Sequence, residues 1–96
     1  MVDADALTPE SVVERNESLL SAEVGSDLVM LHVEKNAYYD TDAIGADIWR
    51  QLEQPTRIGD LCAALVERYE VAAEQCEADV LAFLRDAYRE GLIRIV

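Results

Sequence analysis

The sequence predicts an α+β fold of the winged helix-turn-helix type, in which an N-terminal three-stranded antiparallel β-meander precedes three α-helices. Before residue 42 apolar side chains recur at the two-residue period of strands. After it they recur every three or four residues, as on one face of a helix. The chain has 96 residues, of which 51% are hydrophobic, which suits one core and leaves no room for a second.

Three segments carry strand signals. The first has Leu20, Ala22 and Val24 at alternate positions, which predicts a half-buried strand. The second, residues 28–33, is apolar on both faces and is expected at the centre of the sheet. The third, residues 37–41, follows a short polar turn and contains two tyrosines. Short turns in series predict a meander, and its third strand lies at an edge unless the first lies outside it.

The first helix is expected from residue 43 to about residue 53. Asp42 stands at its N-cap, where a carboxylate accepts hydrogen bonds from the free N–H groups of the first turn. Gly45 costs about 1 kcal/mol against alanine inside a helix, so we expect something to pack against the helix backbone there. The apolar stripe of this helix comprises Ile44, Ile48 and Leu52, with Trp49 beside them.

Two further helices complete the predicted order. The second is expected to be capped by Thr56, and the third to run from about residue 73 to residue 90. Gly91 stands where a helix C′ glycine belongs, and the apolar residues 92–96 should pack back on the core. Residues 1–11 are polar and acidic, and we expect them to form a flexible tail before a single domain of residues 12–96.

The composition disfavours several classes of function. The formal net charge of −12 opposes binding to nucleic acid and to anionic membrane surfaces. No secretory signal or membrane span is visible, so a cytoplasmic protein is expected. With one histidine and two cysteines, Cys62 and Cys76, a zinc site would lack ligands, and we expect two buried, reduced thiols. No catalytic constellation or phosphate loop is present, which predicts no enzyme, no cofactor and no metal.

The exposed edge of the third strand indicates what the domain can bind. An edge strand presents unpaired N–H and C=O groups to which an extended peptide can add as a further strand. The third helix is its expected wall, because it carries more apolar residues than one helical face holds. Broad core burial explains those residues equally well from their spacing alone; they are Leu81, Phe83, Leu84 and Tyr88.

An ordered set of residues between positions 16 and 95 carries a resemblance to a known family. The set comprises Tyr38-Tyr39, Asp42, Gly45-Ala46, Ile48-Trp49, Thr56-Arg57-Ile58, Leu61, Leu65, Tyr69, Val71, Asp79-Val80, Phe83-Leu84 and Gly91-Leu92-Ile93. It resembles the PqqD family, the peptide-recognition elements of ribosomally made and modified peptides. Tyr38-Tyr39 and Ile48-Trp49 make the chain most similar to the stand-alone members of lasso-peptide clusters. Thr41 departs from the family pattern, which usually has leucine before the helix cap.

The resemblance implies a non-catalytic protein that binds the leader segment of a precursor peptide. The leader would add to the third strand, lie against the third helix, and be presented to a tailoring enzyme, which is a leader peptidase in lasso pathways. Which of the two tyrosines faces the core is left open. The implied peptide-binding residues are Ala37, Tyr38, Tyr39 and Asp40 on the strand, and Asp79, Val80, Phe83, Asp86 and Ala87 on the helix.

Other functions remain to be weighed. A PqqD-type chaperone would deliver its peptide to a radical SAM enzyme instead of a peptidase. A winged-helix DNA-binding regulator shares the fold class but needs basic residues on the third helix, which is mostly acidic. A small acidic carrier protein needs a serine attachment site at a helix start, and none is present. A subunit whose groove binds another folded protein is a further alternative, because it would also leave the edge strand paired.

Overall fold

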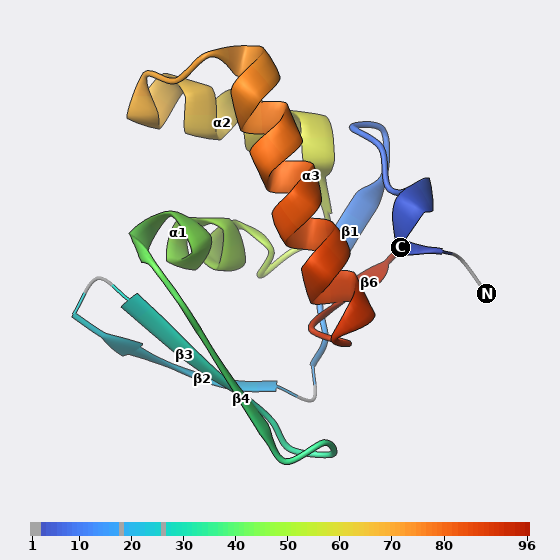
Figure 1. The fold of residues 1–96 in the computed structure, drawn as a ribbon, viewed down its shortest axis with the longest axis vertical. Helices are drawn as coiled ribbons and strands as arrows, with labels where there is room; N and C mark the ends of the chain where they lie inside the picture. The colour runs from blue at the N-terminus through green and yellow to red at the C-terminus, as the bar shows by residue number, and fades with distance from the viewer. Residues whose placement is uncertain (1–2, 18, 26) are drawn as a thin grey trace.

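The computed structural model of the chain describes residues 3–17, 19–25 and 27–96. Helix α1 lies over one face of a three-stranded sheet, and α2 lies on the far side of α1 from that sheet (Figure 1). Helix α3 runs past α1, and its C-terminal end lies near β4 and a second, smaller sheet. In chain order the elements are η1 (Ala4–Ala6), β1 (Val12–Arg15), β2 (Leu19–Val24), β3 (Asp27–His32), β4 (Ala37–Thr41), α1 (Ala43–Gln51), β5 (Thr56–Arg57), α2 (Ile58–Tyr69), α3 (Ala73–Arg89) and β6 (Ile93–Ile95).

The predicted meander and the three helices that follow it are confirmed. Strand β3 lies between β2 and β4, and all pairings in this sheet are antiparallel. The buried side chains of β3 are Leu28, Met30 and His32, which fixes the face of the sheet that joins the core. Within the described residues β4 pairs with β3 alone, so it is the edge strand that the sequence predicted.

The apolar alternation of β2 faces away from the core, contrary to the prediction of a half-buried strand. Leu20 is 62% exposed and Val24 is 63% exposed. The register with β3 explains this, because Leu20 lies opposite Leu31, whereas Ser21 lies opposite the buried Met30. Alternation in sequence gives the period of a strand but not the face that is buried.

A second sheet joins the two ends of the chain. Strand β1 pairs with both β5 and β6, all antiparallel. None of these three strands is among the segments that the sequence predicts, and β5 and β6 are only two and three residues long. Ala4 and Leu7 are buried, and Arg85 of α3 donates to the Leu7 carbonyl at 3.1 Å. These contacts were not expected for residues 1–11, and the domain boundary at residue 12 stays a prediction.

Helix α1 begins as the sequence predicts. An oxygen of the Asp42 carboxylate accepts from the Gly45 N–H at 2.9 Å, which caps the first turn. A Cβ added at Gly45 would collide with the side chain of Thr41, the last residue of β4. The expected close packing at Gly45 is therefore confirmed. It involves the residue that departs from the PqqD-like pattern.

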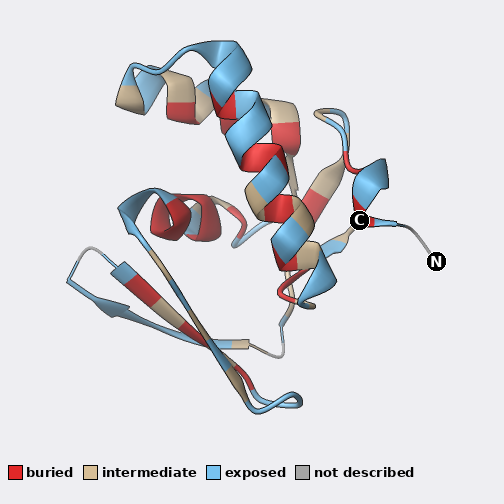
Figure 2. Ribbon diagram, viewed as in Figure 1, coloured by how far each residue is buried: buried red, intermediate tan, exposed pale blue. Residues whose placement is uncertain are grey.

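Helices α2 and α3 pack against each other and enclose the core together with α1 (Figure 2). The predicted cap of α2 is wrong, because Thr56 lies in β5 and its hydroxyl donates to the carbonyls of Gln51 and Gln54. The predicted end of α3 is confirmed. Gly91 has φ of +77°, its N–H donates to Tyr88, and the next N–H donates to the Ala87 carbonyl.

The two cysteines lie where α2 and α3 face each other, and both are free and buried. The Cys76 thiol donates to the Cys62 carbonyl at 3.8 Å. Burial raises the pKa of the Cys62 thiol to about 11, so the thiol is protonated at neutral pH. None of the described helices combines the length and apolar composition needed to cross a bilayer.

Candidate functional site

The candidate site lies between the free edge of β4 and helix α3. A cavity of about 180 Å³, here named the β4–α3 cavity, opens between them. Its lining is apolar at the bottom and acidic at the rim. The lining residues are Met30, Tyr39, Asp40, Thr41, Phe83, Asp86, Ala87, Glu90 and Leu92.

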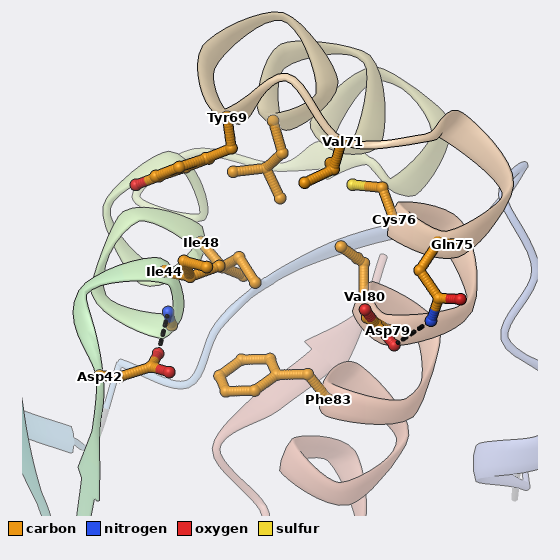
Figure 3. A pocket seen from close by; sticks show the side chains of 12 residues that line it. Asp42, Ile44, Ile48, Tyr69, Val71, Gln75, Cys76, Asp79, Val80 and Phe83 are labelled. Carbon is orange, nitrogen blue, oxygen red and sulfur yellow. Dashed lines mark hydrogen bonds between the residues drawn. The ribbon is translucent and has the colours of Figure 1, made fainter.

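A second cavity of about 300 Å³, the α1–α3 cavity, continues from the first between the start of α1 and the middle of α3. Figure 3 shows Ile44 and Ile48 of α1 facing Val80 and Phe83 of α3 across it, with Tyr69 and Val71 closing the end near α2. The full lining is Asp42, Ile44, Gly45, Ile48, Leu65, Tyr69, Val71, Gln75, Cys76, Asp79, Val80 and Phe83.

Phe83 lines both cavities and is the residue that joins them. It is half-buried and packs against the core, and its ring points from α3 toward the β4–α1 junction (Figure 3). Its neighbour one turn earlier, Val80, is buried at the floor of the larger cavity. The two cavities together form one apolar groove along α3. The free edge of β4 lies at one end of this groove.

The two tyrosines of β4 lie on opposite faces of the sheet. Tyr39 faces α3, and its hydroxyl donates to the Glu90 carboxylate at 2.9 Å. That hydrogen bond is the main reason that the pKa of Tyr39 is raised. Tyr38 is 73% exposed on the opposite face of the sheet. The structure thus brings one tyrosine into the cavity and leaves the other outside it.

Seven of the nine predicted binding residues lie beside these cavities. Ala37 begins β4 outside both linings, as does Tyr38. The two helix carboxylates are exposed, Asp79 accepting from Gln75 and Asp86 from Arg89. The seven that line a cavity are Tyr39, Asp40, Asp79, Val80, Phe83, Asp86 and Ala87.

Sequence reasoning missed the contribution of α1 and of the α2 end. Ile44 was assigned to a buried stripe, but it is 47% exposed and lines the α1–α3 cavity. Val71 is also exposed and lines the same cavity after α2 has ended at a left-handed Glu70. The sequence did contain a signal for both residues. Ile44 lies in the first turn of α1 and Val71 lies just after α2, and a large apolar residue at such a position need not be buried in the core.

A buried carboxylate supports the wall formed by Tyr69. Asp47 of α1 accepts from the Tyr69 hydroxyl and, at 2.9 Å, from the Arg50 guanidinium, and Arg68 lies 3.4 Å away. The Tyr69 hydrogen bond is the largest of the effects that lower the pKa of Asp47; Arg68 and Arg50 add to it, while burial opposes it. This cluster ties α1 to the end of α2 beside the α1–α3 cavity.

We expect Asp47→Asn to lower the free energy of unfolding by about 2 kcal/mol near pH 7. The folded-state pKa lies below the unfolded value, so the contribution is complete above an unfolded pKa of about 3.9 and is lost as the pH falls through the folded value. Urea unfolding near pH 7 and near pH 3 measures it. Asp60→Asn, which removes an exposed carboxylate, is the control. Equal destabilisation by Asp47→Asn at both pH values contradicts the assignment.

Comparison with known proteins gives a family and two similar structures. The family model for coenzyme PQQ synthesis protein D (PqqD) matches residues 27–93. The structure of TbiB1 in complex with the TbiA(beta) leader peptide is similar with a TM-score of 0.79 and 28% identity, over 84% of this chain and 94% of that one. No curated protein matches this chain.

The second similar structure is a solution NMR structure of the PqqD truncation of Methylobacterium extorquens PqqCD. It is described as a functional, stand-alone recognition element for ribosomally synthesised and post-translationally modified peptides. The TM-score is 0.80 over 97% of this chain and 99% of that one, and the identity is 15%. At this identity the likeness shows the shared fold. The expected fold is therefore confirmed by an independent structure.

Proposed function

The chain belongs to the PqqD family, and on that premise we propose that it is a non-catalytic recognition element that binds the leader segment of a ribosomally made precursor peptide. The observation that carries the proposal is the free edge of β4 beside two apolar cavities along α3. TbiB1, which shares this fold, was solved with a leader peptide bound. In this proposal the protein acts in the cytoplasm, where precursor peptides are made.

The leader would bind as a strand added to β4. Main-chain hydrogen bonds each contribute only about 0.5–1.5 kcal/mol net, and the leader loses conformational freedom when it binds. Apolar leader side chains must therefore supply most of the affinity by filling the two cavities. The binding residues would be those predicted on β4 and α3, with Ile44 and Val71 as additional contacts.

We further propose that the bound precursor is presented to a tailoring enzyme. We favour the lasso-type pathway and its leader peptidase over a radical SAM enzyme, because Tyr38-Tyr39 and Ile48-Trp49 resemble the stand-alone members of lasso-peptide clusters.

A DNA-binding role is disfavoured by the partners of the α3 arginines. Arg85 donates to the Leu7 carbonyl, and Arg89 forms ion pairs with Asp5 and Asp86. A recognition helix needs cationic side chains that can reach phosphates and bases. Here the two arginines of α3 are engaged within the protein.

Fluorescence polarisation tests the proposed function. The protein is titrated into a labelled leader peptide from the precursor encoded nearest its gene, with a labelled DNA duplex in parallel. Saturable binding of the leader and none of the DNA is expected. DNA binding without leader binding would instead support a winged-helix regulator. Absence of binding to the leader, alone and with the tailoring enzyme added, contradicts the proposal.

Leader affinity should depend on salt concentration. The rim of the two cavities carries Asp79, Asp86 and Glu90, and the whole chain has a net charge of −12. These exposed carboxylates would attract basic leader residues, and salt screens such pairs over about 10 Å at 0.1 M. We expect the dissociation constant to rise about 3- to 10-fold between roughly 0.05 M and 0.5 M NaCl. An unchanged dissociation constant contradicts a role for the acidic rim.

A further inference from the structure

The face of the β2–β3–β4 sheet that points away from α1 is uncovered among the described residues (Figure 1). The side chains in the middle of this face are apolar. Leu20, Leu31 and Tyr38 lie side by side across the three strands. Leu20, Val24 and Tyr38 are each more than 60% exposed. We name this surface the outer sheet face; it comprises Leu20, Ala22, Val24, Val29, Leu31 and Tyr38.

The polarity of β2 is the reverse of what a solvated strand requires. An antiparallel sheet with one wet face normally places polar side chains on that face. The polar side chains of β2 instead lie on the face of the sheet that α1 covers, where the Glu23 carboxylate pairs with Arg50 of α1. The apolar side chains are left on the outer sheet face. A contiguous apolar surface of this kind marks an interaction site more often than an isolated exposed residue does.

The charges around the outer sheet face select the kind of partner. Asp27 and Asp40 occupy outward positions of β3 and β4, and both are exposed. Lys35, in the turn between these strands, is directed away, since its amine donates to the Glu90 carbonyl beside α3 at 2.8 Å. A second copy of this chain would bring acidic groups together on a protein of net charge −12. A partner with an apolar centre and a rim of Lys or Arg fits this surface.

The outer sheet face is continuous with the proposed leader site. A leader strand on β4 would extend the same sheet by one strand, and every second leader side chain would then project beside Tyr38 and Asp40. A protein seated on the outer sheet face would contact the recognition domain and the leader together.

We propose that the outer sheet face docks the tailoring enzyme, through an apolar patch ringed by basic residues on that enzyme. The inference rests on the proposed function, because it takes the partner to be the enzyme that processes the bound precursor. It also predicts that leader binding and enzyme binding are thermodynamically coupled. A bound leader enlarges the enzyme's contact surface, so leader and enzyme should each raise the other's affinity by the same factor.

Single substitutions on β2 test this inference, because β2 lies on the far side of β3 from the leader edge. The probe is the purified tailoring enzyme encoded beside this chain's gene, and its association is measured by biolayer interferometry with and without leader. Val24→Lys and Leu20→Lys are expected to weaken enzyme association about tenfold or more. Leader affinity, measured separately by fluorescence polarisation, is expected to stay unchanged.

Matched controls separate docking from general surface effects. Val96→Lys alters a valine of nearly the same exposure, 66% against 63%, outside this sheet, and should leave enzyme association unchanged. Asp27→Lys should weaken association, whereas Glu67→Lys, an exposed carboxylate on α2, should not. Unfolding midpoints equal to wild type show that each variant is folded.

Three results would overturn the docking inference. The first is enzyme association that is unaffected by Val24→Lys and Leu20→Lys, or absent in the wild type with and without leader. The second is a wild-type dimer in sedimentation velocity that Val24→Lys converts to a monomer, which would assign the face to self-association. The third is leader affinity lost in the same β2 variants. Failure of wild-type leader binding is a separate result, which contradicts the proposed function.

Discussion

Phe83→Ala is expected to weaken leader binding at least about 30-fold, or about 2 kcal/mol. Among the described residues Phe83 alone lines both cavities, so its truncation removes the apolar surface that joins them. Val80→Asp should weaken binding further, because it places a carboxylate on the floor of the α1–α3 cavity, where apolar leader side chains are expected. Fluorescence polarisation with the labelled leader gives the dissociation constants.

Two controls isolate the binding effect. Tyr88→Ala truncates another aromatic residue of α3, one that lines neither the β4–α3 nor the α1–α3 cavity, and should leave affinity within about twofold of wild type. His32→Gln changes a buried side chain of β3 outside both cavities and should have a similarly small effect. Circular dichroism and thermal unfolding confirm that each variant folds. Equal affinities for Phe83→Ala, Val80→Asp and His32→Gln in folded proteins contradict the placement of the leader.

Gly45→Ala is expected to lower the free energy of unfolding by about 1–2 kcal/mol. Alanine is the better helix former by about 1 kcal/mol, so a stabilising change would be expected on propensity alone. The added methyl group would, however, collide with the Thr41 side chain, and overpacking of this kind costs about 1–3 kcal/mol and occasionally more. For a domain of this size we expect the thermal midpoint to fall by about 5–15 °C.

A double-mutant cycle shows whether Thr41 is the cause. Thr41→Ala removes the hydroxyl and methyl groups that would collide with a Cβ at residue 45. The Cβ of residue 41 remains, and it still lies close to that added Cβ. Gly45→Ala should then cost less than about 1 kcal/mol, which gives a coupling energy of about 1–2 kcal/mol between the two sites. Urea denaturation of the four proteins measures the cycle. Additive effects of the two substitutions contradict the proposed contact.

Features governed by local chemistry were predictable from the sequence. The Asp42 cap, the close approach at Gly45 and the left-handed Gly91 each depend on residues near in the chain, and each is found in the structure. The central position of β3 followed from its two apolar faces. The excess of apolar residues on α3 indicated that this helix faces a second neighbour, and the resemblance to the PqqD family supplied Val80 and Phe83 as its binding residues. Both side chains line a cavity beside α3.

Features governed by long-range pairing were not predictable. Strands β5 and β6 are too short to show a period, and they exist because β1 pairs with both. The buried face of the meander depends on where α1 crosses it, which alternation in β2 cannot reveal. For the same reason the sequence left the facing of Tyr38 and Tyr39 open. Ile44 was misassigned because a helical stripe does not distinguish a core from a cavity wall.

The central claim is that the leader adds to β4 as a strand, and amide hydrogen exchange followed by NMR tests it most directly. Along an edge strand, alternate N–H groups point to the neighbouring strand or to solvent. Saturating leader should therefore slow exchange at every second residue of Ala37–Thr41, where the free N–H groups become paired, and leave the intervening residues unchanged. A leader that binds with the same affinity in this sample but changes exchange at none of these residues would contradict strand addition.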